Sequence, residues 1–324
     1  MRILLLEFFS SGGIFIDSEC ERSPHERSTL VDEGWKMLQA LLRDALRRDG
    51  LYIDVLLDES CDHTTEEALS HANVNCHPVA NAEQFTQQLD DLAVTADYVI
   101  AIAPETDELL SQLAARLRKC GASVLLPSAS QICWSSSKTQ TCQMLTDYNI
   151  PTPGILSQKQ LVSLNQDAFV VMKPDDGAGC VDTRVLTIAE LSSVKPNSDM
   201  LIQPYQSGTD VSVSVIMGNN PVVMSPLYQQ IKNVNQVLSF TGVEGDVAAE
   251  HAERATQLAD RCIPLFPGAR GWIGIDMVIG ETPEDDMVIE INPRLTSSFC
   301  TLSEIADVSL VGMILDNATC HEST

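Results

Sequence analysis

Two short apolar runs near the C-terminal end of the chain, WIGIDMVI and MVIEINPR, carry acidic and amide side chains whose spacing suits metal chemistry. The runs are rich in β-branched residues, and the acidic loop between them contains Pro283, so they predict an antiparallel hairpin. Pairing symmetric about Pro283 places Asp276 opposite Glu290, and Asn292 projects from the same face as Glu290. Two carboxylates and an amide oxygen favour a hard cation such as Mg²⁺, with Mn²⁺ as an alternative. A solvated outer face of a sheet would show the same residues, so the hairpin alone leaves both interpretations open.

A second group of residues suits phosphate binding. Lys173 ends an apolar run and is followed by a loop that contains Gly177 and Gly179. Glycines let backbone N–H groups approach phosphate oxygens, and a lysine supplies a point charge. The loop is not a Walker loop, since no Gly-Lys-Ser/Thr is present and a strand follows it; a plain hairpin turn explains it equally well. Lys138, in SSKTQT at a predicted helix start, is either a further phosphate ligand or a solvated surface lysine.

Two other positions suit a nucleoside. In LIQPYQSGTDVSVS an apolar strand meets a polar break and a new strand, so that Gln203 and the backbone beside it can face an adenine edge, and Asp210 can accept hydrogen bonds from ribose hydroxyls. An ordinary strand connection is the competing interpretation. Just beyond the hairpin, Arg294 places a positive charge where a metal-bridged phosphate would lie.

The elements that must position these residues fall into two regions. The first alternates strands with helices, which predicts a parallel α/β sheet; the strands are 2–9, 52–57, 74–79, 98–103 and 122–126, and the helices 29–48, 64–71, 82–94 and 107–119. The Gly-rich turn after the first strand lacks GxGxxG, which argues against a nicotinamide dinucleotide. From about residue 130 the strands follow one another closely and predict antiparallel pairing; they are 168–173, 181–186, 200–204, 210–217 and 222–229, with helices at 137–147 and 247–264.

The order of these groups along the chain resembles the ATP-grasp ligase superfamily throughout residues 130–315. The resemblance implies an N-terminal parallel α/β pre-ATP-grasp domain (1–130) and a two-subdomain α+β ATP-grasp domain (131–324). In the second domain it implies a nucleotide-binding flap subdomain at about 138–205 and a metal-binding catalytic subdomain at about 206–320.

The resemblance also implies roles for the residues described above. The nucleotide would be held by Lys138 and Lys173 at the phosphates, Gly177–Gly179 as the flap, Gln203 and the Tyr205 backbone at adenine, and Asp210 at ribose. Two Mg²⁺ ions would be held by Asp276, Glu290 and Asn292, while Arg294, together with Lys173, would act on the transferred phosphoryl group. Gln203 and Asp210 replace the Glu that many relatives carry, and both can still accept hydrogen bonds.

At finer grain, the opening ILLLEFFSSGG and the Glu33-Gly34 pair resemble a narrower group that contains the tyramine–glutamate ligases of methanofuran biosynthesis. The implied reaction joins a carboxylate such as glutamate to an amine such as tyramine through an acyl phosphate, with release of ADP and phosphate. Candidate ligands for a substrate carboxylate, each equally explained by a surface position, are Lys232, Arg270 and Ser297–Ser298. The alternatives are a carbamoyl-phosphate-synthase-like enzyme, a peptide-forming enzyme or a non-catalytic nucleotide-binding module.

Composition narrows the partners. A formal charge of −25 in 324 residues disfavours nucleic acid and anionic membranes as partners, and no stretch approaches the roughly 18 apolar residues of a membrane span. Ten cysteines without a CxxC pair, in a chain that opens without an export signal, indicate reduced thiols and a cytoplasmic location. The expected partners are therefore ATP, Mg²⁺ and small carboxylate and amine substrates, and a homodimer is compatible with the sequence.

Overall fold

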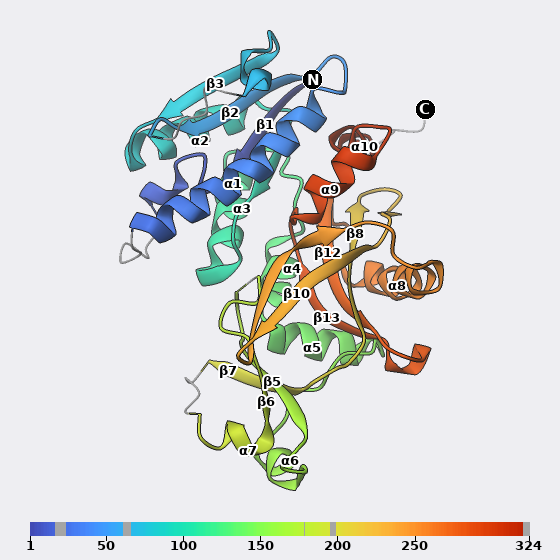
Figure 1. Cartoon of the computed structure of the whole chain (residues 1–324). Coiled ribbons are helices and arrows are strands. Elements are labelled where there is room, and N and C mark those ends of the chain that lie inside the picture. The colour runs from blue at the N-terminus through green and yellow to red at the C-terminus, as the bar shows by residue number, and fades with distance from the viewer. Residues whose placement is uncertain (17–23, 61–65, 178, 195–198, 320–324) are drawn as a thin grey trace.

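The computed structural model describes residues 1–16, 24–60, 66–177, 179–194 and 199–319. Its strands form two sheets, one that ends before residue 103 and one that begins after residue 168. Figure 1 shows the first sheet in blue and cyan, the second in yellow to red, and the last two helices, α9 (Ser298–Ile305) and α10 (Leu310–Ala318), beside the first sheet and its helix.

The first sheet is parallel, as predicted, with the strand order β3-β2-β1-β4. Its strands are β1 (Arg2–Glu7), β2 (Tyr52–Asp58), β3 (Val74–Val79) and β4 (Tyr98–Ile102). The helices are α1 (Pro24–Ala45), α2 (Ala82–Thr95) and α3 (Leu109–Lys119), with short 3₁₀ turns η1 (Gly13–Phe15), η2 (Glu67–Ser70) and η3 (Thr106–Glu108). Successive side chains of a strand point to opposite faces, so Ile3 and Leu5 pack with α1 while Leu4 and Leu6 pack with α2 and α3.

The second sheet is antiparallel and follows the order β13-β12-β8-β10-β11-β6-β5-β7, with β9 paired to β8. Its strands are β5 (Phe169–Pro174), β6 (Arg184–Thr187), β7 (Met200–Pro204), β8 (Thr209–Met217), β9 (Val222–Val223), β10 (Leu227–Val234), β11 (Val237–Glu244), β12 (Gly271–Ile279) and β13 (Met287–Asn292). Its helices are α4 (Ala129–Ser136), α5 (Lys138–Asp147), α6 (Gln158–Ser163), α7 (Ile188–Leu191) and α8 (Ala249–Cys262), with 3₁₀ turns η4 (Ile263–Leu265) and η5 (Pro283–Asp285). The predicted parallel α/β region followed by an antiparallel α+β region is confirmed.

The β12–β13 hairpin has the predicted register, with Asp276 opposite Glu290. The pairing shifts by one residue directly after Asp276, so that Met277 lies opposite Val288. Such a bulge re-aims side chains locally and is common next to functional sites.

Several boundaries differ from the prediction. Residues 122–126 form no strand and contribute a single bridge, Val99 to Val124. Helix α4 is an additional element that was not predicted, and a capping box formed by Ser128 and Gln131 marks its start. The return strand expected at 181–186 begins only at Arg184, because Asp182 has a positive φ of 51° that takes it out of extended geometry. The expected strand 222–229 is two strands, and the hairpin partner β11 was not predicted. The helix expected at 64–71 is the 3₁₀ turn η2, and residues 64 and 65 lie outside the described part of the chain.

Helix α1 joins the two regions. Arg48, just after its end, donates to the Gly312 carbonyl at 2.7 Å and forms an ion pair with Asp316 at 2.7 Å. The buried Asp44 carboxylate accepts from the Val311 backbone N–H at 2.7 Å. One apolar cluster also contains residues of both sheets, including Trp272 from β12. The two regions therefore share a packed interface, which fixes where the ends of β1 and β4 meet the second sheet.

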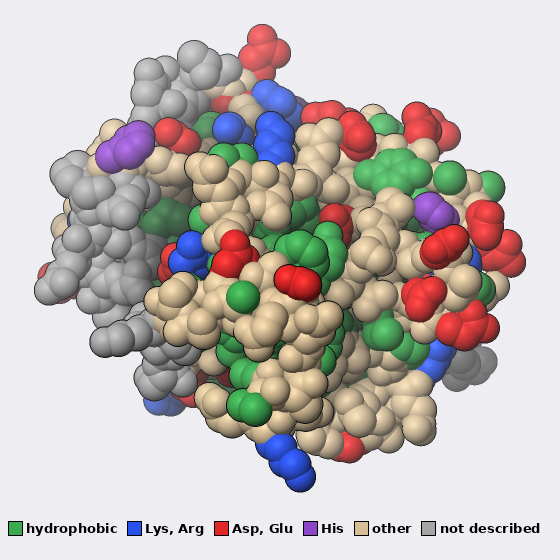
Figure 2. All heavy atoms as spheres, turned by 60° about the horizontal axis from the view of Figure 1, so that its bottom comes forward, with side chains coloured by type: hydrophobic (Ala, Val, Ile, Leu, Met, Phe, Trp, Pro, Cys, Tyr) green, Lys and Arg blue, Asp and Glu red, His purple; other side chains and the backbone are tan. Residues whose placement is uncertain are grey.

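Within the described residues, no single helix is long and apolar enough to cross a membrane; α9 and α10 reach that length only as a pair bent by 104°. On the face shown in Figure 2, acidic side chains are spread among polar groups with scattered Lys and Arg, in line with the net charge of −25. The seven cysteines of the described ranges are all free thiols, and only Cys142 and Cys262 among them are buried.

Candidate active site

The centre of the site is the hairpin face that holds Asp276, Glu290 and Asn292. Asp276 accepts a hydrogen bond from the Ser212 hydroxyl of β8 at 2.9 Å and from the Asn292 amide at 3.1 Å. The Gln229 side chain of β10 also hydrogen-bonds to this carboxylate. Since both oxygens of Asp276 are oriented by neighbours, the carboxylate has a fixed direction, and the three predicted metal ligands lie together.

The electrostatics of this face favour a cation. Burial, reinforced by the opposing Glu290 carboxylate, raises the pKa of Asp276 from 3.8 to about 6. A divalent ion between the two carboxylates would remove that penalty, and carboxylate and amide oxygens suit Mg²⁺. Among the described residues, no group of three or more His, Cys, Asp or Glu could hold a metal on its own. The protein therefore supplies two carboxylates and an amide, and the other oxygens of an octahedral ion would come from a ligand or water.

Two lysines face this carboxylate pair from other elements. Lys138 is the first residue of α5, and its Nζ donates to the Gly177 carbonyl at 2.8 Å and lies 3.7 Å from Glu290 Oε1. Lys173, at the end of β5, is 5% exposed. Burial lowers the pKa of Lys173 to about 8 even though the nearby Glu290 raises it. The predicted lysines thus meet at Glu290, where they present two cationic groups to the hairpin.

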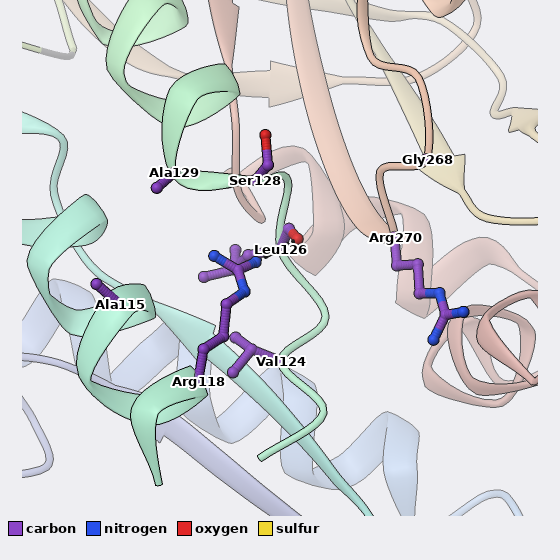
Figure 3. Close-up of a pocket in the computed structure, with 8 residues that line it drawn as sticks. All are labelled: Ala115, Arg118, Val124, Leu126, Ser128, Ala129, Gly268 and Arg270. Atoms are coloured by element: carbon purple, nitrogen blue, oxygen red, sulfur yellow. Dashed lines mark hydrogen bonds between the residues drawn. The ribbon is translucent and has the colours of Figure 1, made fainter. Parts of the chain in front are cut away.

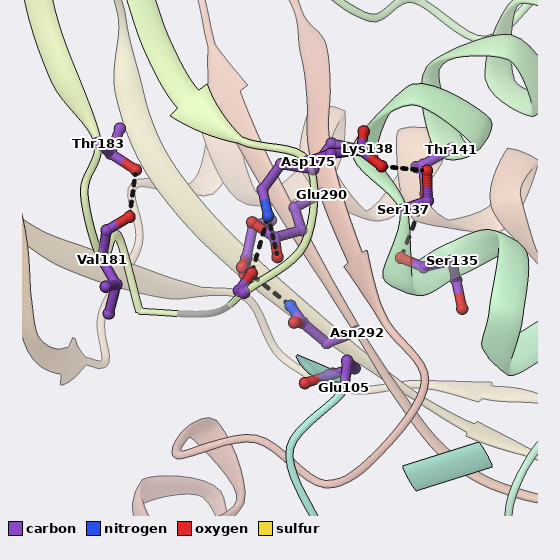
Figure 4. A network of polar contacts seen from close by, with 12 residues as sticks. Glu105, Ser135, Ser137, Lys138, Thr141, Asp175, Val181, Thr183, Glu290 and Asn292 are labelled. Carbon is purple, nitrogen blue, oxygen red and sulfur yellow. Dashed lines mark hydrogen bonds and ion pairs between the residues drawn. The ribbon is translucent and has the colours of Figure 1, made fainter. Parts of the chain in front are cut away.

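The loop after Lys173 is anchored at its start to helix α5. The Asp175 carboxylate accepts from the Ser137 hydroxyl at 2.7 Å (Figure 4). It also accepts from the Thr139 backbone N–H at 2.8 Å, and both donors lie at the start of α5. These hydrogen bonds hold the pKa of Asp175 below its ordinary value, against the opposite effect of burial. Gly177 and Gly179 have φ values of 104° and 69°, which glycine adopts most readily. Residue 178 lies outside the described part of the chain.

The predicted nucleoside residues lie on two different parts of the sheet: Gln203 is on β7, which pairs with the Lys173 strand β5, Tyr205 directly follows β7, and Asp210 is on β8, which pairs with β12. Gln203 pairs across the sheet with Val171 and is 4% exposed, and its amide donates to the Pro153 carbonyl at 2.6 Å. Tyr205 is exposed and packs edge-on against Phe169, with ring centroids 6.4 Å apart. Asp210, on β8, has its pKa raised to about 6 by burial. The side-chain amide of Gln203 is therefore held by the protein, and the backbone beside it is the group that could face a base.

Arg294 is paired across the two regions of the chain. Its Nη2 lies 2.8 Å from Oε2 of Glu105, a buried residue that follows β4. Sequence reasoning missed Glu105, although its place at the carboxyl end of a parallel strand is where α/β sheets bind ligands. It also missed Ser212, which the alternation of Asp210 and Ser212 along one strand could have revealed. Asp175 and Gln229 had no comparable signal.

The three candidate substrate-carboxylate ligands are not brought together. Lys232 is exposed on β10. The buried Ser298 hydroxyl donates to the Ser212 hydroxyl at 3.3 Å, which places it one contact from Asp276. Arg270 lines a separate cavity of about 330 Å³ with Arg118, and none of the predicted nucleotide or metal residues lines that cavity. Figure 3 shows the Arg118 guanidinium beside Leu126 and the Arg270 guanidinium turned away from it.

Two protein families match this chain, one in each of its two regions. The ATP-grasp domain family matches residues 135–298, and the pre ATP-grasp 3 domain family matches residues 53–132. Tyramine–L-glutamate ligase from Methanocaldococcus fervens is 24% identical over 304 residues, which cover 93% of this chain and 92% of the relative.

Solved structures share the fold over almost the whole chain. An ATP-grasp superfamily protein from Archaeoglobus fulgidus has a TM-score of 0.71 at 20% identity and covers 99% of this chain and 90% of its own. L-amino acid ligase from Bacillus licheniformis has a TM-score of 0.64 at 14% identity, and the match covers 98% of this chain and 74% of that chain. D-alanine–D-alanine ligase from Bacillus anthracis, solved with ATP, gives 0.58 at 15% identity, with 98% and 97% covered. Because the ATP-grasp match at 135–298 spans half of the 324 residues, this chain belongs to the ATP-grasp family of ligases.

Proposed function

We propose that the enzyme joins a carboxylate to an amine at the expense of ATP. The observation that carries this proposal is the meeting of Asp276 and Glu290 with Lys138 and Lys173, which places paired carboxylates and paired ammonium groups face to face. Such an arrangement suits a magnesium–triphosphate complex, since it offers one side to the metal and one to the phosphates. A non-catalytic nucleotide-binding module would not need the complete set of metal ligands.

We assign each residue a role from its position relative to the paired carboxylates and lysines. Lys138 and Lys173 would hold the phosphates, and Gly177–Gly179 would cover them. The Gln203–Tyr205 backbone would face adenine, and Asp210 would accept from the ribose hydroxyls. Asp276, Glu290 and Asn292 would hold Mg²⁺, or Mn²⁺ in its place, which when bound neutralises charge on the phosphates. The division of the chain into residues 1–130 and 131–324 stays a prediction.

The proposed reaction has two steps. An oxygen of the substrate carboxylate attacks the γ-phosphorus, the bond from that phosphorus to the β–γ bridging oxygen breaks, and ADP leaves. The amine nitrogen then attacks the carbon of the acyl phosphate, the C–O bond to phosphate breaks, and the amine loses a proton as the amide forms. Positive groups fixed in place before the reaction stabilise the charge on the moving phosphoryl group. In this scheme Lys173 and Arg294 provide that charge, and the 174–180 loop excludes water from the acyl phosphate.

The substrate pair to test first is L-glutamate with tyramine. The support is the likeness of 93% of this chain to a tyramine–L-glutamate ligase, at 24% identity. The opening sequence ILLLEFFSSGG and the Glu33-Gly34 pair point to the same group. In the structure Gly34 lies against Glu7, since a Cβ at Gly34 would come within 2.1 Å of Glu7 Oε2. These two sequence features therefore form one contact at the carboxyl end of β1.

The decisive experiment measures ADP release with MgATP over a panel of carboxylates and amines that includes glutamate, tyramine and bicarbonate. We expect release that requires one carboxylate and one amine, and its loss in Glu290→Gln, whose amide cannot balance Lys138 or hold a metal equally well. Glu284→Gln is the matched control, because Glu284 is exposed at the tip of the same hairpin. Normal turnover by Glu290→Gln would remove the hairpin from the mechanism, and release supported by bicarbonate alone would favour the carbamoyl-phosphate type of reaction.

A further inference from the structure

The ion pair between Glu105 and Arg294 connects the end of β4 to the segment that follows β13. The side chains are 5% and 13% exposed, so the pair is largely removed from water. A buried ion pair is a poor device for stability, because desolvation offsets most of its attraction and apolar residues of similar volume serve as well or better. The position of this pair, two residues after the Asn292 amide, suggests a different purpose.

The pair is also incomplete. Within the described residues, Glu105 Oε1 and Arg294 Nε are both buried without a hydrogen-bond partner. Buried polar atoms are nearly always satisfied in folded proteins, and exceptions often mark places where a ligand or ion completes the contacts. The Glu105–Arg294 pair therefore has unused hydrogen-bonding capacity.

Arg294 has more than one carboxylate within electrostatic range. Besides Glu105 it interacts with Glu290 and with the buried Glu7 at the end of β1. Glu290 is the more accessible competitor, with 22% of its side chain exposed. A guanidinium that moved onto Glu290 would occupy the oxygens proposed for the metal and would leave the phosphoryl position. Something must hold Arg294 away from Glu290. Its Nη1 donates to the Leu295 carbonyl at 3.2 Å, and Glu105 is the carboxylate that forms an ion pair with it.

The loop that carries Glu105 also lies close to the flap. Thr106, the next residue, is a neighbour of Gly177, since a Cβ added at Gly177 would come 4.0 Å from the Thr106 methyl group. Asp107 and Glu108 follow with φ values of 53° and 59°, a conformation that non-glycine residues adopt only when the surroundings enforce it. In Figure 4, Glu105 lies at the same end of the polar network as Asn292.

We propose that Glu105 is a positioning residue, which holds the Arg294 guanidinium at the phosphoryl site and away from the metal carboxylate Glu290. This inference rests on the proposed ligase function. It assigns the N-terminal region a part in phosphoryl transfer, through Arg294 and without contact to the reacting atoms.

The test compares Glu105→Gln with Asp316→Asn. Both changes remove the acidic partner of an Arg that links the same two regions of the chain, but Arg48–Asp316 joins α1 to α10 and none of the catalytic residues takes part in it. We expect Glu105→Gln to lower kcat about 10- to 100-fold, the scale of a small misplacement of a catalytic group, and to raise the half-saturating Mg²⁺ concentration several-fold, with KM for the amine unchanged. Asp316→Asn should change neither parameter, and Glu105→Asp, which keeps the charge, should recover part of kcat.

Three results would overturn the proposal. A purely structural role predicts a lower Tm with unchanged kcat and Mg²⁺ dependence. A rise confined to KM for the amine would mean that Glu105 contacts the amine itself. In an Arg294→Ala background, Glu105→Gln should cause no further loss, and an additional loss of similar size would show that Glu105 acts independently of Arg294.

A crystal structure of Glu105→Gln with a non-hydrolysable ATP analogue gives a readout that does not depend on turnover. We expect the Arg294 guanidinium to have left its position and to contact Glu290; an unchanged guanidinium would refute the inference. If no substrate pair releases ADP from the wild-type enzyme, the ligase function fails, while this structural comparison still decides whether Glu105 positions Arg294.

Discussion

Replacing Asp276 by Asn should make the ligand-free protein more stable at neutral pH while it inactivates the enzyme. The carboxylate has its pKa raised from 3.8 to about 6 by burial and by Glu290, so its charged form is disfavoured in the folded state. A shift of about 2 units corresponds to about 3 kcal/mol, which the charged form costs once the pH is well above 6. Asn has nearly the same shape and removes this cost.

The direction in which stability changes with pH follows from proton binding by Asp276. Between pH 4 and 6 the folded protein holds the Asp276 proton more tightly than the unfolded chain does, so the free energy of unfolding falls as the pH rises. For a change in pKa from 3.8 to about 6, the free energy of unfolding is lower than that of the protein with Asp276 protonated by about 1.6 kcal/mol at pH 5 and by about 3 kcal/mol at pH 8. Asn keeps the bond from Ser212 and loses the one from Asn292, a loss of about 1 kcal/mol, while the Gln229 amide, which has both a donor and an acceptor, can pair with either atom of the new amide. The variant should therefore exceed wild type by about 0.5 kcal/mol at pH 5 and about 2 kcal/mol at pH 8.

Urea unfolding of both proteins in the presence of EDTA, from pH 5 to pH 8, measures this difference. Asp210 also has a pKa raised to about 6, but it titrates in both proteins and cancels from the comparison. Substrate-dependent ADP release should be absent from the variant. A variant that is less stable than wild type by the same amount at every pH would show that Asp276 bears no charge penalty, and the argument for a cation at the hairpin would fail.

Three further predictions concern other parts of the site. Affinity for ATP should weaken as the pH rises through about 8, because Lys173 loses its proton there in the free enzyme, and Lys173→Arg should bind ATP without this pH dependence. Calorimetric titration from pH 7 to 9.5 measures both affinities, and a parallel decline in the variant would contradict the prediction. Gly177→Ala should lower kcat at least tenfold, whereas Gly121→Ala should leave kcat unchanged. Both glycines have a positive φ, so each variant should lose about 1 kcal/mol of stability in urea unfolding. Equal kcat values for the two variants would show that the flap takes no part in catalysis. Gly34→Ala should lower the free energy of unfolding by about 2 kcal/mol or more, because the new methyl group meets the buried Glu7 carboxylate, and an unchanged Tm would contradict that packing.

The sequence contained enough to place the hairpin because two local rules act together there. The side-chain period of a strand is two residues, and a polar loop around Pro283 sets the register, so Asp276 had to face Glu290. The helix start at Lys138 was equally local, because Ser137 caps it. Features of this kind depend on residues close together in sequence and can be predicted without knowing the rest of the fold.

The errors arose where distant contacts outweigh local preference. Helix α4 was not among the predicted elements, because Ile132 and Trp134 are buried against elements distant in sequence and composition alone does not show that burial. The Glu105–Arg294 pair joins residues nearly 190 positions apart, so no periodicity could have indicated it. The position of Glu105 after a parallel strand marks it as a candidate, but its pairing with Arg294 shows only once the two sheets are placed against each other.

The opposite shifts of two buried groups indicate what the site is built to bind. Burial raises the pKa of Asp276 to about 6 and lowers the pKa of Lys173 to about 8, so each group is disfavoured in its charged form. A cation alone would stabilise the charged carboxylate but repel Lys173, and an anion alone would do the reverse. Glu290 couples the two groups, because it raises both pKa values. A ligand that carries a divalent cation on one side and a polyanion on the other relieves both penalties at once, which is the charge pattern of a metal–nucleotide complex and of neither component alone.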